Sequence, residues 1–167
     1  MHKELAMSPE ILEWITNRAP EFAHLDESER NAIADFSMVW SFFEGTALSG
    51  SCNIAEIRKF AEKLAVQNSI GNCNINLYLP YLKQRYFVNG ELTHHFEHLH
   101  IERSGNPAEI VEALCNEAAS EKTKLIGCLG VIFRLRNNLF HGEKWQYQLR
   151  NQKQNFINAT NFLMSCM

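Results

Sequence analysis

The strongest constraint on the fold is a repeated pattern in which a helix-capping residue stands directly before apolar residues at helical spacing. Ser8, Asp26, Asn53 and Ser120 each precede such a stretch. The side-chain oxygen of a cap accepts a backbone N–H of the first helical turn, which otherwise lacks a partner. No stretch shows the convincing apolar–polar alternation of a strand. We therefore expect an all-α protein, a helical bundle of four to five main helices plus short helices.

The expected helices follow from these starts and from the residues that end them. They cover residues 9–19, 26–48, 54–67, a segment that begins near Pro80 or is kinked there, 107–119 with Asn106 as cap, 121–140, and about 146–164. Apolar residues on nearly all sides of 26–48 predict a buried, central helix. Gly127 and Gly130 are each unfavourable inside a helix by roughly 1 kcal/mol relative to Ala. They therefore predict close packing against another helix, in the same chain or in a second subunit.

Length and composition indicate one domain over residues 1–167, with residues 1–7 expected to be loose. A chain of 167 residues can bury a sizeable core, and 46% hydrophobic with 21% charged residues is typical of globular proteins. No stretch has the apolar length of a membrane span, and the charged start has no signal-peptide core, so we expect a cytoplasmic protein without a membrane partner. The five cysteines are scattered, so reduced thiols are expected, with Cys115 and Cys128 in the core.

The charge of the chain is uneven along its length. Residues 122–154 contain seven basic residues and one acid, a local charge of +6, whereas the whole chain carries −3. The rest of the chain therefore carries −9. A basic segment on an acidic body is compatible with a local site for a polyanion. The alternative is that these charges lie on the solvated faces of two helices.

One stretch near the C-terminus, residues 133–142, carries the residues best suited to chemistry. Arg136 can hold a phosphate with its planar fork of donors, Asn137 can donate and accept, and His141 can move a proton near neutral pH. On an ideal helix, Arg136 and His141 point roughly 140° apart. They can act together if Gly142 ends the helix and His141 swings back, or if two copies of the helix face each other.

Three further residues are candidates for supporting roles at this stretch. Arg134 and Lys144 are candidates for flanking phosphate contacts. Glu44 stands inside an apolar run, so it either faces solvent or pairs with Arg136 or Arg134, because a lone buried charge is costly. On residue chemistry alone, the alternative to a phosphodiester site is an ordinary basic helix end that pairs with such an acid.

Four histidines fall within seven residues, at His94, His95, His98 and His100. His94 and His98 would share a helical face, and histidines spaced in this way are a workable pair of zinc ligands. The stretch lacks the H-E-x-x-H order that makes such a pattern specific. A solvated, partly cationic segment is the preferred interpretation, and no metal or cofactor is expected.

The stretch Arg136-Asn137-Asn138-Leu139-Phe140-His141-Gly142-Glu143-Lys144 resembles the signature of HEPN domains. That signature is an arginine, a polar residue, a few more residues and then a histidine, near the end of a late helix. The sequence from Arg136 to Gly142 is especially similar to that of the Apea-like branch of the family. The resemblance covers about ten residues, and the expected helical layout agrees with it.

The resemblance implies a fold, a partner and an activity. HEPN domains are all-α bundles that commonly dimerise, so that the arginine and histidine of two copies approach one another across a cleft. Many cut RNA without a metal, as toxins of toxin–antitoxin pairs or in antiphage defence. For this chain, the resemblance implies a homodimeric endoribonuclease with Arg136, Asn137 and His141 in its site. Other HEPN domains serve as non-catalytic modules that dimerise or bind a nucleotide or a partner such as an antitoxin protein, and this alternative stays open.

Overall fold

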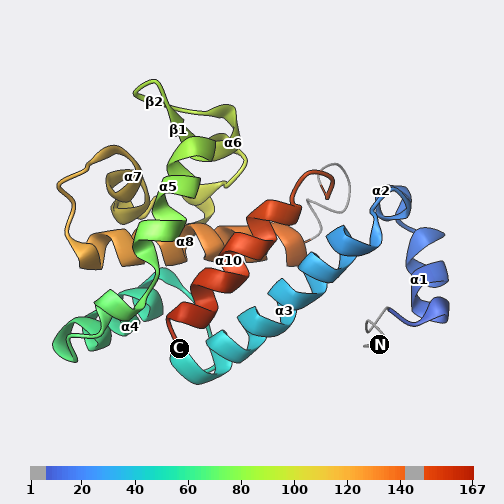
Figure 1. Cartoon of the computed structure of the whole chain (residues 1–167), viewed down its shortest axis with the longest axis horizontal. Helices are drawn as coiled ribbons and strands as arrows, with labels where there is room; N and C mark the ends of the chain where they lie inside the picture. The colour runs from blue at the N-terminus through green and yellow to red at the C-terminus, as the bar shows by residue number, and fades with distance from the viewer. Residues whose placement is uncertain (1–6, 142–148) are drawn as a thin grey trace.

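The computed structural model describes residues 7–141 and 149–167, and within them the chain is mostly helical (Figure 1). One short antiparallel hairpin is the exception among the described residues, with Phe87 opposite Leu92 and Val88 opposite Glu91. The prediction of an all-α helical bundle is confirmed. Within the described part of the chain, no helix has both the length and the apolar character to cross a membrane.

The elements follow one another in the order labelled in Figure 1. They are α1 (Pro9–Thr16), α2 (Pro20–Ala23), α3 (Glu27–Ala47), α4 (Ile54–Val66), η1 (Ile70–Asn72), α5 (Ile75–Tyr86), β1 (Phe87–Val88), β2 (Glu91–Leu92), α6 (His94–Glu97), η2 (Ile101–Ser104), α7 (Ala108–Cys115), α8 (Glu121–Phe140) and α10 (Lys153–Ser165). The two longest helices are α3 and α8. The last helix, α10, packs along α3.

Local caps begin the longest helices where the sequence predicts them. The Asp26 carboxylate accepts the backbone N–H of Glu29 at 2.8 Å, and the Glu29 side chain accepts that of Asp26 at 2.9 Å. Asn53 caps α4 through a bond of 3.0 Å from the Glu56 N–H. Ser120 starts α8 by accepting the N–H of Thr123 at 3.1 Å. Each cap satisfies an N–H that the helix cannot satisfy itself.

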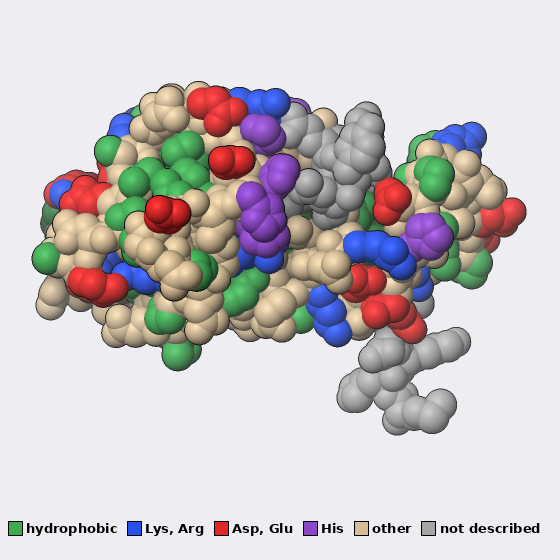
Figure 2. Space-filling model, turned by 90° about the horizontal axis from the view of Figure 1, so that it is seen from above, with side chains coloured by type: hydrophobic (Ala, Val, Ile, Leu, Met, Phe, Trp, Pro, Cys, Tyr) green, Lys and Arg blue, Asp and Glu red, His purple; other side chains and the backbone are tan. Residues whose placement is uncertain are grey.

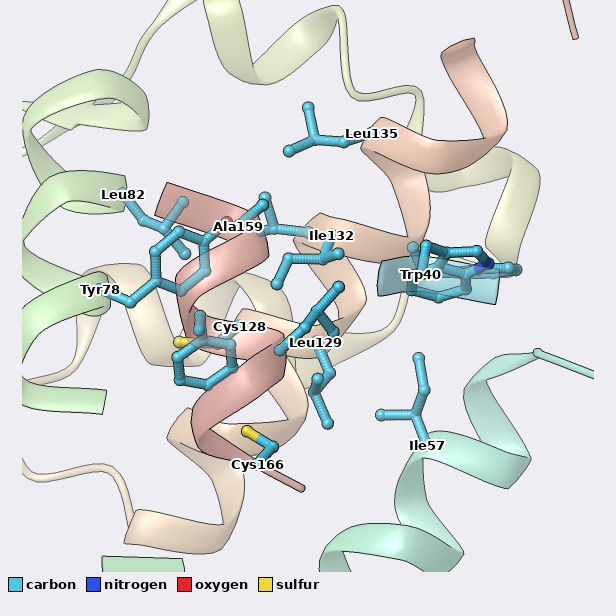
Figure 3. Packing of buried hydrophobic residues seen from close by; sticks show 14 of the residues in the cluster. Trp40, Ile57, Tyr78, Leu82, Cys128, Leu129, Ile132, Leu135, Ala159 and Cys166 are labelled. Carbon is cyan, nitrogen blue, oxygen red and sulfur yellow. The ribbon is translucent and has the colours of Figure 1, made fainter. Parts of the chain in front are cut away.

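Helix α8 is the central element of the core. It packs against α7, α4 and α5, while α10 packs against α3. Every residue of α8 from Leu125 to Leu135 is buried, and Figure 3 shows part of the surrounding core. The prediction that residues 26–48 form the buried central helix is wrong in this respect, because Met38 and Phe42 of α3 are 72% and 63% exposed.

The two glycines of α8 mark its contact with α7 of the same chain. A Cβ atom placed on Gly127 would lie 2.5 Å from the Ala113 Cβ and 2.7 Å from the Glu109 carbonyl oxygen. A Cβ on Gly130 would lie 2.9 Å from the side chain of Ile110. The predicted close packing against another helix is therefore confirmed, and the partner is a helix within the subunit.

Several local expectations are corrected by the structure. Helix α5 begins at Ile75 and has Pro80 inside it, so only the alternative of a start near Pro80 is wrong. Asn106 is not the cap of α7: it has a positive φ of 49°, and the helix begins after Pro107. Cys115 is exposed, whereas Cys128 is buried as expected. The last helix begins at Lys153, and the expected earlier start near residue 146 lies outside the described residues.

Candidate active site at the end of helix α8

The last turn of α8 carries the chain from the core to the surface. Residues 125–135 are buried, Arg136 and Asn137 are half-buried, and Phe140 and His141 are exposed. Leu139 keeps this turn attached to the core, because its side chain is 1% exposed. The predicted site residues therefore lie where a helix anchored in the core emerges towards solvent.

The Arg136 guanidinium is held on several sides. Its Nη1 donates to the Asn137 Oδ1 at 2.9 Å, and its Nη2 lies 3.7 Å from the Glu44 Oε2. The guanidinium carbon also lies 5.2 Å from the centre of the Phe140 ring, which is within the range of a cation–π contact. The side chain is 28% exposed. Arg136 is thus oriented by neighbours and still reachable from solvent.

Glu44 is the acid that pairs with Arg136, so of the two alternatives left open by the sequence, exposure to solvent or pairing with an arginine, the structure shows the pair. Its Oε2 also accepts the indole N–H of Trp40 at 3.1 Å, and its Oε1 accepts the backbone N–H of Cys52 at 2.9 Å. The Glu44 side chain is 18% exposed. A carboxylate this far from water is stabilised only when it is paired and hydrogen-bonded, which is the situation here.

The surroundings of Glu44 exclude a nucleophilic role for the nearby thiol. The pKa of Cys52 is raised to about 12, mainly by burial and then by the nearby Glu44 charge, while Arg136 opposes the shift. The thiolate is the reactive form of cysteine, so Cys52 stays an inert thiol near neutral pH. The sequence argument missed Trp40 and Cys52 as partners of Glu44. The spacing of Trp40 and Glu44, four residues apart on one helix, was the available signal for the first.

His141 forms the C-terminal cap of α8. Its backbone N–H donates to the Asn137 carbonyl at 2.9 Å, and its side chain is exposed. Among the described residues, no hydrogen bond or ion pair joins the His141 side chain to Arg136 or Asn137. The structure therefore brings Arg136, Asn137 and Glu44 together, and leaves His141 at the same helix end, pointing to solvent.

Arg134 has a different role from the one expected. It is 4% exposed, and its guanidinium donates to the Leu99 carbonyl at 2.9 Å, to the Ser104 hydroxyl at 3.0 Å and to the Asn138 side-chain oxygen at 3.2 Å. Its donors are therefore engaged inside the protein, so a phosphate contact at Arg134, which stays a prediction, would require the side chain to give up these hydrogen bonds. Lys144, the other candidate for such a contact, lies outside the described residues.

Asn138 and Arg134 together form a hydrogen-bonded connection, called the brace below, between α8 and the segment between α6 and η2. Its side-chain N–H donates to the His98 carbonyl at 2.9 Å, while its oxygen accepts from Arg134. The two side chains thus tie the last turns of α8 to the segment between α6 and η2. Sequence reasoning overlooked Asn138, because its partner lies 40 residues away along the chain.

The described basic residues of segment 122–154 are largely paired or buried. Lys122 pairs with Glu62 at 2.8 Å, and Lys124 pairs with Glu121 at 3.1 Å. Arg134 is buried and Arg136 pairs with Glu44. Most of the local charge is therefore balanced or enclosed, and the phosphate affinity of this segment would depend on Arg136 and on residues beyond α8.

The histidine segment lies close to this helix end without forming a metal site. The rings of His94 and His95 have centres 4.0 Å apart, and those of His94 and His98 are 6.3 Å apart. Figure 2 shows histidine side chains gathered on one face of the molecule. Within the described ranges, no group of three or more His, Cys, Asp and Glu side chains is arranged to hold a metal ion.

Comparisons with known proteins give no relative from which a role could be transferred to these residues. Neither a protein family, nor a curated protein, nor a solved structure matches this chain. The case for a function therefore depends on the chemistry and geometry of the α8 helix end, together with the similarity of residues 136–144 to the HEPN signature.

Proposed function

We propose that the protein is a metal-independent endoribonuclease of the HEPN type, which acts as a toxin or an antiphage-defence component. The observation that carries the proposal is the arrangement at the end of α8. A half-buried, oriented Arg136 with Asn137 beside it stands one turn before an exposed His141. An oriented cation and a proton-transfer group are the two functions that RNA cleavage requires from a protein.

RNA supplies the nucleophile of the reaction. The 2′-hydroxyl oxygen attacks the adjacent phosphorus and loses its proton to a base, while the bond from phosphorus to the 5′-oxygen breaks and that oxygen gains a proton. The products are a 2′,3′-cyclic phosphate and a 5′-hydroxyl. His141 would serve in these proton transfers, a contribution of typically 10²–10⁴-fold. Arg136 would stabilise the charge that develops on the phosphate, and Asn137 would orient its guanidinium.

Two copies of the chain supply what one copy lacks. Two protons move in the reaction, and each copy contributes one histidine at this helix end. The described hydrogen bonds and ion pairs also join Arg136 to Asn137 and Glu44 and not to His141. A homodimer that opposes two α8 ends would place the histidine of one copy near the arginine of the other. This is the arrangement that we propose for the active form.

RNA cleavage in EDTA tests the proposal. Wild type should cut single-stranded RNA, and His141→Ala and Arg136→Lys should each lose activity by about 100-fold or more. Arg136→Lys keeps the charge next to Glu44 but removes the planar fork, so the fold should survive. Matched controls are Arg18→Lys and His24→Ala, because both residues lie in the α1–α2 region and far along the chain from α8.

The products give a second, independent reading. A 2′-deoxy substitution at the cut position should block cleavage, and the released fragments should carry 2′,3′-cyclic phosphate and 5′-hydroxyl ends. Circular dichroism must show each variant folded. Wild type that cuts no RNA, or variants at Arg136 and His141 that cut as fast as wild type, would refute the nuclease.

The alternative function is a non-catalytic module that dimerises and binds a partner, for example an antitoxin protein. The observation that favours it is an apolar groove of about 320 Å³ between α3 and α10, whose lining includes Met38, Val39, Ile157 and Met164. Met38 is 72% exposed and Met164 is 51% exposed, which is unusual for large apolar side chains that have no partner. A protein that cuts no RNA but loses self-association on Met38→Asp, by analytical ultracentrifugation, would favour this function.

A further inference from the structure

A second cationic site lies outside the end of α8, in a hollow of about 480 Å³ between α6 and the residues that precede α10. Its described lining contains two arginines, three histidines and two side-chain amides (Arg85, His94, His95, His98, Arg150, Asn151 and Gln152). None of these lining side chains is acidic. The histidine group visible in Figure 2 lies on this side of the molecule.

The charge of the lining calls for an anion. Arg85 and Arg150 are permanent cations, and histidine gains its proton within the physiological pH range. The whole chain carries −3, so the gathering of cationic groups here runs against the overall balance. An anion bound in the hollow would be attracted by the two arginine charges.

Arg85 has donor capacity that the protein leaves unused. Its Nε is buried and has no hydrogen-bond partner among the described residues, and its Nη2 reaches the Gln152 side-chain oxygen only at 3.5 Å. The guanidinium carbon lies 5.7 Å from the centre of the Tyr86 ring. A buried donor without an acceptor costs free energy, so a small shift of the guanidinium onto a bound anion would remove that cost.

The lining is held in place by hydrogen bonds from outside the hollow. The Thr93 hydroxyl donates to the Arg85 carbonyl at 2.7 Å, and the Thr93 backbone N–H donates to the Tyr86 carbonyl at 2.9 Å. On the opposite wall, the Gln152 side-chain oxygen accepts from Asn155 at 3.0 Å. These hydrogen bonds order the backbone at Arg85 and the Gln152 side chain before a ligand arrives, which lowers the ordering entropy lost on binding.

We infer that this hollow binds a phosphate group. Guanidinium forks and imidazole N–H groups match the several oxygens and double charge of phosphate better than they match a carboxylate with two oxygens. A metal ion is disfavoured because two arginines flank the histidines. The volume leaves room for the sugar that carries the phosphate. The inference goes beyond the proposed nuclease, since no residue of the Arg136–His141 pair lines the hollow.

Titration with inorganic phosphate tests the inference. Histidine ring resonances should shift saturably with phosphate and not with chloride at equal ionic strength. Arg150→Gln should raise the dissociation constant about tenfold, as expected for the loss of one charged hydrogen-bond donor. Arg150 is exposed, so its substitution should leave the fold intact. Arg85→Gln is the second variant, and Arg18→Gln is the matched control that should bind like wild type.

Two further probes separate the sources of such a phosphate. Adenosine 5′-monophosphate carries a terminal phosphate, whereas a DNA hexanucleotide without terminal phosphates offers only backbone phosphates. Saturable binding of either probe, weakened by Arg150→Gln, supports the site and identifies its source. His141→Ala should bind phosphate like wild type, so the site can exist even if the nuclease proposal fails. The inference is overturned if wild type shows no saturable phosphate binding, if neither arginine variant weakens it, or if the histidines bind zinc and exclude phosphate.

Discussion

At Glu44, the two carboxylate oxygens interact with one donor from the same helix, one from the loop after it and one from α8. Trp40 and Cys52 donate hydrogen bonds to them, and Arg136 pairs with them at 3.7 Å. The pair is a single long contact, so it leaves the guanidinium with donors for a phosphate. A phosphate at Arg136 would also lie near the Glu44 charge, which would oppose it. Glu44 therefore holds the arginine in position at some expense to anion affinity.

Substitutions at Glu44 test this balance. Glu44→Ala should lower the free energy of unfolding by about 2–3 kcal/mol, since it leaves an indole N–H, a backbone N–H and a guanidinium without their acceptor. Glu44→Gln keeps an acceptor and should cost about 1 kcal/mol. Urea denaturation of both, with the exposed Glu112→Gln as control, measures the difference. A Glu44→Ala protein with unchanged stability and activity would contradict the structural role of this ion pair.

Among the elements, α7 and α8 approach one another closely at Gly127 and Gly130. The backbone carbonyl of Glu109 faces Gly127, and backbone cannot give way as a side chain can. At Gly130 the neighbour is the end of the Ile110 side chain, which can rotate. The two glycines therefore differ in how much they tolerate a methyl group, although the sequence presents them alike.

Alanine substitutions should separate these two positions. Gly127→Ala should lower the free energy of unfolding by about 1–2 kcal/mol, because overpacking costs more than the gain in helix propensity. Gly130→Ala should be close to neutral. Gly45→Ala on α3 is the control, since nothing lies within 4 Å of its added Cβ, and it should raise stability by about 0.5 kcal/mol. Thermal unfolding of the three variants is the measurement, and equal effects at Gly127 and Gly130 would contradict this account.

Helices that are defined by interactions between residues close in sequence could be predicted from the sequence. The caps at Asp26, Asn53 and Ser120 bond to residues three positions away, so a short window contains the whole interaction. The extent of α8 followed from its cap and its apolar run. The start of α5 before Pro80 did not, because the helix is held by packing that outweighs the local preference.

The candidate site also has features that could be predicted from the sequence and features that could not. Residue types at Arg136, Asn137 and His141 were visible in the sequence, and so was the choice of Glu44 as a partner. The role of Arg134 was not visible, because its acceptors at Leu99 and Ser104 are 35 and 30 residues away. Nothing in the local sequence distinguishes a buried, structural arginine from an exposed one. Only the path of the chain around α6 and η2 does so.

For the whole molecule, the proposed active form needs two chains. If each cleft combines the arginine of one copy with the histidine of the other, a mixture of two inactive variants can rebuild it. Arg136→Lys and His141→Ala proteins, unfolded together and refolded, should regain RNA cleavage that neither shows alone. Each variant refolded by itself is the control. A mixture that forms dimers yet stays inactive would argue against the shared cleft.

The brace formed by Arg134 and Asn138 has a consequence for the length of the RNA fragments that the proposed nuclease would release. These two side chains hydrogen-bond to the carbonyls of His98 and Leu99, so the segment that carries His98, on one wall of the proposed phosphate hollow, is tied to the helix that bears Arg136. A strand held by its terminal phosphate would then meet Arg136 after a set number of nucleotides. The distance from the bound terminal phosphate to the cut position would then be constant. A sequencing gel of end-labelled RNA would show one dominant fragment instead of a ladder.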